Sequence, residues 1–248
     1  MNRFIILAAV VLASANLCAQ ELTSSEKHAI RAFVNDLKYG RKELVAGSVS
    51  YPLYRKYPLR PIESEGEFLV HYDEFIDKPL IESVEKGEWF RYGWRGIHCA
   101  YEHIGVIAGD IDDNGEFYVS WIGLSSVGEK AWRDCVERQK KRLYSGLQDF
   151  SVPIMMFETI KYTIRIDMMP NETYRYVCWS RKKSISSKPD LIINNGESWA
   201  EGSLHITYYK FCNGDYSYTI SPGEQLDYSL TVSKNNINLL TQEGSLIY

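Results

Sequence analysis

The sequence has no excess of positive charge. Its 28 Lys and Arg residues are outnumbered by 32 Asp and Glu residues, which gives a formal net charge of −4. A chain with this balance has no overall electrostatic attraction for a phosphate backbone, so we expect no nucleic-acid partner. Hydrophobic residues make up 45% of the chain, which is ordinary for a globular protein and excludes a disordered one.

Long apolar runs are also scarce, and the only one covers residues 4–13. It follows Arg3 and precedes small residues that end at Ala19. This order is typical of a cleavable signal peptide, and we place the cleavage after Ala19, so that residues 1–19 are removed, with Ala15 as the alternative site. The run is about half the roughly 20 residues that a membrane-spanning helix needs. We therefore expect an exported protein, periplasmic or secreted, with no transmembrane segment after cleavage.

A lipoprotein is the less favoured alternative. Cys18 lies close to the predicted cleavage site, where an acylated cysteine could stand. Lipoprotein signals carry small residues just before that cysteine, whereas Asn16 and Leu17 stand there in this sequence.

Cysteine is rare, and cleavage reduces five residues to four. An even number in an exported protein predicts disulfides, and four cysteines allow three connectivities. We favour the pairs Cys99–Cys135 and Cys178–Cys212, because each lies within one half of the chain. The alternative is that some of these cysteines are free and serve as small, buried apolar residues.

The sequence lacks the motifs of catalysis and metal binding. Residues 110–115 match the first six positions of a calcium loop, but Trp121 stands where that loop requires Glu, so a hairpin turn is favoured. His98, Cys99 and His103 form a weak metal cluster, because no second ligand pair is visible elsewhere. We predict no catalytic residue, no metal site and no cofactor.

Two halves of different character are predicted. In residues 20–150, capping boxes at Thr23–Glu26 and Ser64–Glu67 open helices, and strands are expected between residues 88 and 122. This half is predicted to be an α+β domain, with helices packed on a small antiparallel sheet. Residues 151–248 contain short apolar segments separated by turn residues, which predicts an all-β antiparallel sandwich or small barrel.

Aromatic residues are abundant, with 18 Tyr and 6 Trp. Two groups of them lie on predicted strands, and they could either pack in a core or form an exposed contact surface. As binding candidates we select Trp89 and Trp94 in the first half and Tyr209 and Tyr218 in the second.

Several segments carry a family resemblance. They include Glu67-Phe68-Leu69, Phe150-Ser151-Val152-Pro153, Ile164-Arg165-Ile166-Asp167 and Lys188-Pro189-Asp190-Leu191. With these segments the chain resembles a group of uncharacterised exported two-domain proteins of Gram-negative bacteria. The helical half is loosely similar to cystatin-like and nuclear-transport-factor-like α+β domains, and the β half to small periplasmic inhibitor barrels. These folds host enzymes, binders and structural domains alike, so the resemblance implies no site residue.

The favoured function is a non-enzymatic binding or interaction protein of the bacterial envelope, with an envelope protein or a glycan as partner. One alternative is a hydrolase of envelope polysaccharide or peptide, for which His71, Glu74, His98 and His103 are the titratable candidates. The other is an inhibitor or immunity protein against a cell-wall hydrolase.

Overall fold

The computed structural model describes residues 19–201, 206–223 and 227–248. The predicted signal peptide lies almost entirely outside the described residues, as does Cys18. Contacts divide the chain into two compact units. We call residues 19–55 and 60–131 the N-terminal unit, and residues 56–59 and 132–248 the barrel unit. The division falls within helix α7 (Ser126–Arg142), earlier than the residue 150 at which the helical sequence signals end.

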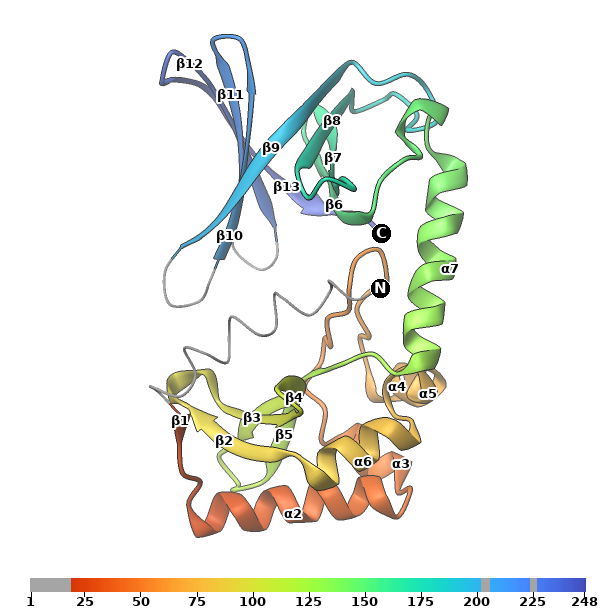
Figure 1. The fold of residues 1–248 in the computed structure, drawn as a ribbon, viewed down its shortest axis with the longest axis vertical. Coiled ribbons are helices and arrows are strands. Elements are labelled where there is room, and N and C mark those ends of the chain that lie inside the picture. The colour runs from red at the N-terminus through yellow and green to blue at the C-terminus, as the bar shows by residue number, and fades with distance from the viewer. Residues whose placement is uncertain (1–18, 202–205, 224–226) are drawn as a thin grey trace. The chain divides into compact units, whose positions relative to one another are not determined.

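The N-terminal unit combines helices with one antiparallel sheet (Figure 1). Its sheet has the order β1-β2-β3-β4-β5. The strands are β1 (Ala19–Gln20), β2 (Glu88–Tyr92), β3 (Ile97–Tyr101), β4 (Ile104–Ile111) and β5 (Phe117–Ile122), and the helices are α2 (Ser24–Lys38), α3 (Lys42–Gly47), α4 (Glu65–Val70), α5 (Tyr72–Phe75) and α6 (Lys78–Lys86). The predicted α+β class of this half is confirmed.

The predicted helix starts are also found. Thr23 caps α2, because its hydroxyl accepts from the Glu26 backbone N–H while the Glu26 carboxylate accepts from the Thr23 backbone N–H. Ser64 caps α4 by accepting from the backbone N–H of Glu67. The predicted cleavage bond, Ala19–Gln20, lies within β1, where Gln20 pairs with Arg91 of β2.

Apolar side chains between the helices and one face of the sheet form the core of this unit. Phe33 of α2 packs against Phe117 of β5, with 5.3 Å between ring centroids, and Trp89 of β2 meets the same ring edge-on at 5.5 Å. Cys99 and Ile107 are fully buried on this face. The opposite face of the sheet therefore carries the alternate residues of each strand.

The barrel unit contains a closed antiparallel barrel, in which each strand pairs with the next and β13 pairs with β6. Of the two architectures expected for this half, the small barrel is correct. Its strands are β6 (Val152–Thr159), β7 (Tyr162–Met168), β8 (Tyr174–Ser180), β9 (Leu191–Glu201), β10 (Ile206–Asn213), β11 (Tyr216–Pro222), β12 (Tyr228–Lys234) and β13 (Ile237–Leu246). Alternate residues such as Phe157, Tyr176 and Phe211 fill the interior. Gly196 faces Phe211 so closely that an added Cβ would lie 2.1 Å from its ring.

A second core lies outside the barrel wall and is partly polar. It includes Val136 and Gln139 of α7 and Leu143 directly after this helix. Arg165 and Asp167 of β7 also belong to it, and their side chains alternate with the interior residues Ile164 and Ile166. Trp132 donates its indole N–H to the carbonyl of Tyr57 at 2.8 Å, which ties α7 to the segment 56–59. In the described ranges, no helix combines the length and apolar character that crossing a bilayer requires.

Candidate binding site on the outer face of the sheet

Four residues form a row across the outer face of the N-terminal sheet. Phe90 of β2 pairs with His98 of β3, His98 pairs with Ala108 of β4, and Ala108 pairs with Trp121 of β5. Directly paired residues of neighbouring strands point to the same face. The adjacent row, Trp89, Cys99, Ile107 and Ile122, points into the core. We call the row Phe90–Trp121, together with Tyr92, Trp94 and Arg95, the aromatic face.

His98 lies at the centre of the aromatic face. Its ring stacks on Phe90 with 6.0 Å between centroids and 16° between planes, and Tyr92 meets it edge-on at 5.9 Å. The imidazole Nε2 donates to the carbonyl oxygen of Arg95 at 3.2 Å. Burial lowers the pKa of His98; the hydrogen bond to the Arg95 carbonyl partly opposes this, and the Arg95 cation lowers the pKa further, so the neutral imidazole predominates at pH 7. A neutral ring among aromatic rings is suited to stacking and apolar contact.

The turn after β2 brings a tryptophan and an arginine to the edge of this face. Residues Gly93–Arg95 form a short 3₁₀ turn, which begins at Gly93 and is followed by Gly96; both glycines have positive φ, 54° and 87°. Trp94 is 63% exposed, and the Arg95 guanidinium lies 5.6 Å from its ring centroid and 5.1 Å from that of Tyr92. Trp121, at the far end of the row, is 44% exposed.

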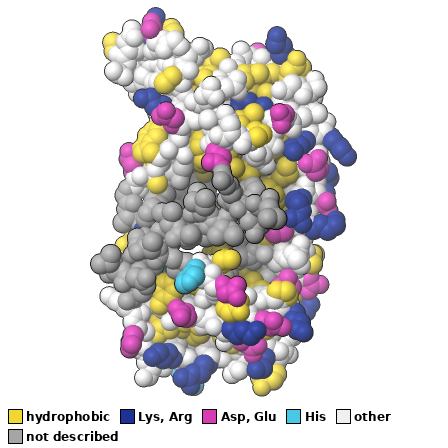
Figure 2. Space-filling model, in the orientation of Figure 1, with side chains coloured by type: hydrophobic (Ala, Val, Ile, Leu, Met, Phe, Trp, Pro, Cys, Tyr) yellow, Lys and Arg dark blue, Asp and Glu magenta, His cyan; other side chains and the backbone are white. Residues whose placement is uncertain are grey.

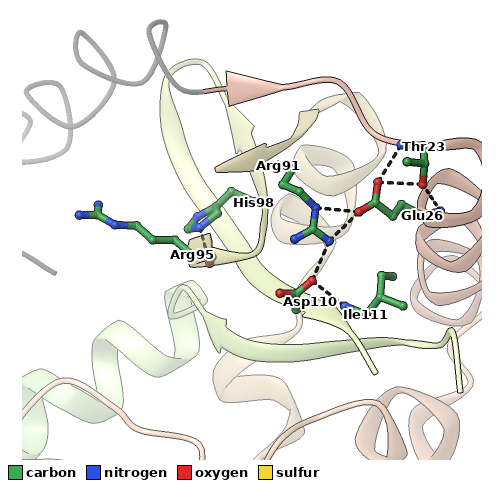
Figure 3. Close-up of polar contacts among 7 residues, drawn as sticks. All are labelled: Thr23, Glu26, Arg91, Arg95, His98, Asp110 and Ile111. Atoms are coloured by element: carbon green, nitrogen blue, oxygen red, sulfur yellow. Dashed lines mark hydrogen bonds and ion pairs between the residues drawn. The ribbon is translucent and has the colours of Figure 1, made fainter. Parts of the chain in front are cut away.

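A polar network on the opposite side of β2 fixes this strand to the rest of the unit. Arg91 donates to Glu26 of α2 at 2.7 Å and to Asp110 of β4 at 2.8 Å. Figure 3 shows the Arg91 side chain pointing toward α2, whereas His98 and Arg95 lie on the other side. Burial alone would raise the pKa of Glu26, but the hydrogen bonds from Thr23 and Arg91 outweigh it and hold this pKa below its usual value.

The four predicted binding residues lie in different surroundings. Trp89 packs in the core of the N-terminal unit, where its indole N–H donates to the Val84 carbonyl at 3.3 Å. Tyr209 is 8% exposed in the barrel interior, and Tyr218 packs against the same core. Trp94 is the member of the group that is freely accessible, and contact with a partner remains a prediction for all four.

The predicted disulfides are wrong, because all four described cysteines are free thiols. Cys178 points into the barrel interior, whereas Cys212 follows the interior residue Phe211 and is exposed on the outside. Two thiols on opposite sides of a barrel wall cannot bond. Cys99 is buried in the core of the N-terminal unit, whereas Cys135 is on α7 in the barrel unit.

Residues 110–115 lie at the hairpin between β4 and β5 that was favoured over a calcium loop: Asp110 and Ile111 end β4, and the turn follows them. The Asp112 carboxylate accepts from the backbone N–H groups of Asn114 at 3.0 Å and Glu116 at 2.8 Å, and Gly115 has a φ of 83°. Asp110 is already paired with Arg91. The described part of the chain contains no group of three or more His, Cys, Asp and Glu side chains that could hold a metal ion.

Of the four titratable candidates for hydrolysis, the structure brings His71 and Glu74 into contact, but it does not join them to His98 or His103. His71 is hydrogen bonded to Glu74 at 2.8 Å, and the other oxygen of Glu74 accepts from Arg55 at 2.8 Å. His98 is bonded to a backbone carbonyl rather than to a carboxylate or hydroxyl. His103 lies in the turn between β3 and β4 with a φ of 65°.

The sequence analysis missed His98 and Trp121 as parts of one surface. Strand alternation could have revealed this surface. His98 precedes the core residue Cys99, and Trp121 precedes the core residue Ile122, so both side chains point to the opposite face of the sheet. The pairing of these two strands with β4 includes register shifts at Cys99/Ala100 and Ala108/Gly109, which no sequence pattern predicts.

Comparison of the chain with protein-family models finds no match, and searches of curated proteins and of solved structures find none either. The resemblance to exported two-domain proteins therefore stays a prediction, and the function has to be argued from the geometry of the site.

Proposed function

We propose that this chain is an exported binding protein of the bacterial envelope and that the aromatic face contacts a partner protein. The observation that carries the proposal is the row Phe90–His98–Ala108–Trp121 with Trp94 at its edge. Trp, Tyr and Arg are the residue types that contribute most to binding energy at protein interfaces.

The chemistry of the face supports binding rather than catalysis. The imidazole of His98 is neutral, stacked and bonded to a carbonyl, so it has no partner that would orient it as a general base toward a nucleophile. Flat aromatic surfaces suit a partner that covers them, whereas hydrolytic sites are concave.

The network beneath the face supports the same interpretation. Arg91 joins α2, β2 and β4 through two ion pairs, so the strand that carries Phe90 and Tyr92 is held before any partner binds. A surface that is already ordered loses less conformational entropy on binding.

Site-specific photocrosslinking in the native host tests this proposal. A benzoylphenylalanine at position 94 or 121 is expected to capture a partner protein of one discrete mass. The same probe in place of Tyr39, which is 70% exposed at the end of α2, serves as the matched control and is expected to capture none. Equal capture at all three positions, or none at 94 and 121, would contradict the proposal.

A further inference from the structure

The barrel unit contains a cavity of about 260 Å³ at the C-terminal end of helix α7. Strands β6 and β7 and the segment 181–185 complete its wall. The polar side chains that line it are Gln139, Arg142, Glu158, Thr163, Arg181, Lys183 and Tyr248. All of these residues belong to the barrel unit, so the cavity is complete within it.

The charged groups of the cavity are mainly positive. Arg142, Arg181 and Lys183 line the cavity together with one acidic side chain, that of Glu158. Glu158 pairs with Arg181 at 2.9 Å, and Lys183 pairs with Asp190 at 2.5 Å outside the cavity. None of the ion pairs among the described residues involves Arg142. Figure 2 shows Lys and Arg side chains along the edge where α7 runs in Figure 1.

A buried group with a surplus positive charge lies next to the cavity, so its charge has the same sign as the lining cations. Asp167 pairs with Arg165 at 2.6 Å and with Arg175 at 2.7 Å, so two guanidinium groups share one carboxylate in the second core. Gln139 connects this group to the cavity, because its Oε1 accepts from Arg165 at 2.6 Å and its Nε2 donates to the Tyr57 hydroxyl at 2.8 Å. Buried charge is weakly screened, so the surplus cation makes the potential in the cavity more positive.

A second cavity of about 350 Å³ adjoins the first and differs from it in charge. The two share Glu158, Arg181 and Ile247. The second is lined by Asp227 and Glu243 and by the hydroxyl residues Thr159 and Ser245. Carboxylates and hydroxyls of this kind accept hydrogen bonds from ligand hydroxyl or ammonium groups.

We propose that the first cavity binds a phosphate group, and that the ligand is a phosphorylated small molecule whose hydroxyl groups extend into the second cavity. Guanidinium groups bind phosphate through two parallel N–H···O bonds, and Arg142 is the lining residue placed to do so. Arg181 also lines the cavity, but it already donates to the Thr159 carbonyl at 3.1 Å and pairs with Glu158. Because Glu158 pairs with Arg181 and Asp190 pairs with Lys183, Arg142 is the lining cation for which the described residues show no ion pair, and the phosphate would supply its counterion. This site is separate from the aromatic face and does not depend on the proposed function of that face.

NMR titration of the mature protein tests the site, with inorganic phosphate, acetate and glucose 1-phosphate as probes. We expect phosphate to shift the amide signals of Gln139, Thr163 and Lys183 with saturation, and glucose 1-phosphate to bind more tightly than phosphate. Acetate is expected to bind more weakly, because it carries one charge. Equal binding of acetate and phosphate, or shifts that spread over the basic surface without saturating, would overturn the proposal.

The variant R142Q is expected to weaken phosphate binding about tenfold, because it removes a charged bidentate donor. K141Q is the matched control: it removes the same charge from the neighbouring exposed position of α7, which does not line the cavity. Its affinity is expected to stay within about twofold of the wild type. Both positions are exposed, so the near-UV circular dichroism of both variants should match the wild type. A loss in K141Q equal to that in R142Q would assign the effect to general surface charge and contradict the site.

Discussion

His98 stacks on Phe90 with 16° between the ring planes, and directly paired positions of two antiparallel strands hold the rings together. The contact places a titratable ring in the middle of an aromatic surface. Burial and the neighbouring Arg95 cation favour the neutral imidazole and together outweigh the hydrogen bond to the Arg95 carbonyl, so His98 is one source of pH dependence in the N-terminal unit.

Acidification is expected to destabilise the protein through His98. Its pKa in the folded state lies below the ordinary value of 6.5, so the unfolded chain binds more protons in the window between the two pKa values. The neutral His98 ring therefore adds its full stabilisation to the unfolding free energy above pH 6.5. This stabilisation is lost as the pH falls toward the pKa of the folded state. Urea denaturation between pH 7.5 and pH 5 should show a smaller pH dependence in H98Q than in wild type.

His28 offers the control for this prediction, because it is exposed on α2. H28Q is expected to retain the pH dependence of the wild type. An unchanged dependence in H98Q would show that other groups cause it.

Removing Arg91 is expected to destabilise the N-terminal unit. R91M leaves the Glu26 and Asp110 carboxylates without their shared cation in a partly buried place, which should cost about 2 kcal/mol of unfolding free energy. K38M breaks a pair of similar length, 2.8 Å to Glu85, at a site where the lysine side chain is 52% exposed. Exposed pairs contribute about 0–1 kcal/mol, so K38M should lie close to wild type. Equal losses in both variants would contradict the structural role of the Arg91 network.

Removing the buried carboxylate of Asp167 is expected to destabilise the barrel unit more than R91M destabilises the N-terminal unit. D167A leaves Arg165 and Arg175 in the second core without a counterion, which is expected to cost about 3–5 kcal/mol. Glu137 of α7 pairs with Lys140 at 3.3 Å but is 62% exposed, so E137A should cost less than about 1 kcal/mol. Thermal denaturation of the two variants measures the difference. A D167A protein as stable as E137A would show that Asp167 does not neutralise the two arginines.

Four free thiols are expected in the folded protein. Cys212 is exposed and should react first with iodoacetamide, whereas burial raises the pKa of Cys99 to about 12 and that of Cys178 to about 11, which leaves both protonated and slow. Mass spectrometry of the protein alkylated with and without urea counts the thiols. If the mass of the non-reduced protein is lower than that of the reduced protein by about 2 Da for each predicted bridge, the disulfides are present and the prediction of free thiols is wrong.

Local sequence signals predicted the elements of the fold well. The Thr23–Glu26 capping box starts α2, and the pair Asn235-Asn236 adopts positive φ at both positions in the turn between β12 and β13. Each of these features depends on residues a few positions apart in the chain. Short-range patterns of this kind do not depend on how the rest of the chain packs.

Long-range relationships were predicted poorly. The disulfide prediction was wrong because it used only the number and order of the cysteines. The register of β10 decides on which side of the barrel wall Cys212 lies. The row that joins Phe90 to Trp121 depends on register shifts in β3–β4 and β4–β5. Residues 56–59 belong to the barrel unit, although about 70 residues separate them from the rest of it. The amino-acid composition of this segment does not predict its contact with the barrel unit.

The central claim is that the aromatic face holds a partner protein, and native mass spectrometry of the protein recovered from its native host tests it most directly. The account predicts that wild type and the control Y39A retain a bound partner, and that W94A and W121A arrive mainly without it. Partner retention by W94A and W121A at the wild-type level would contradict the account.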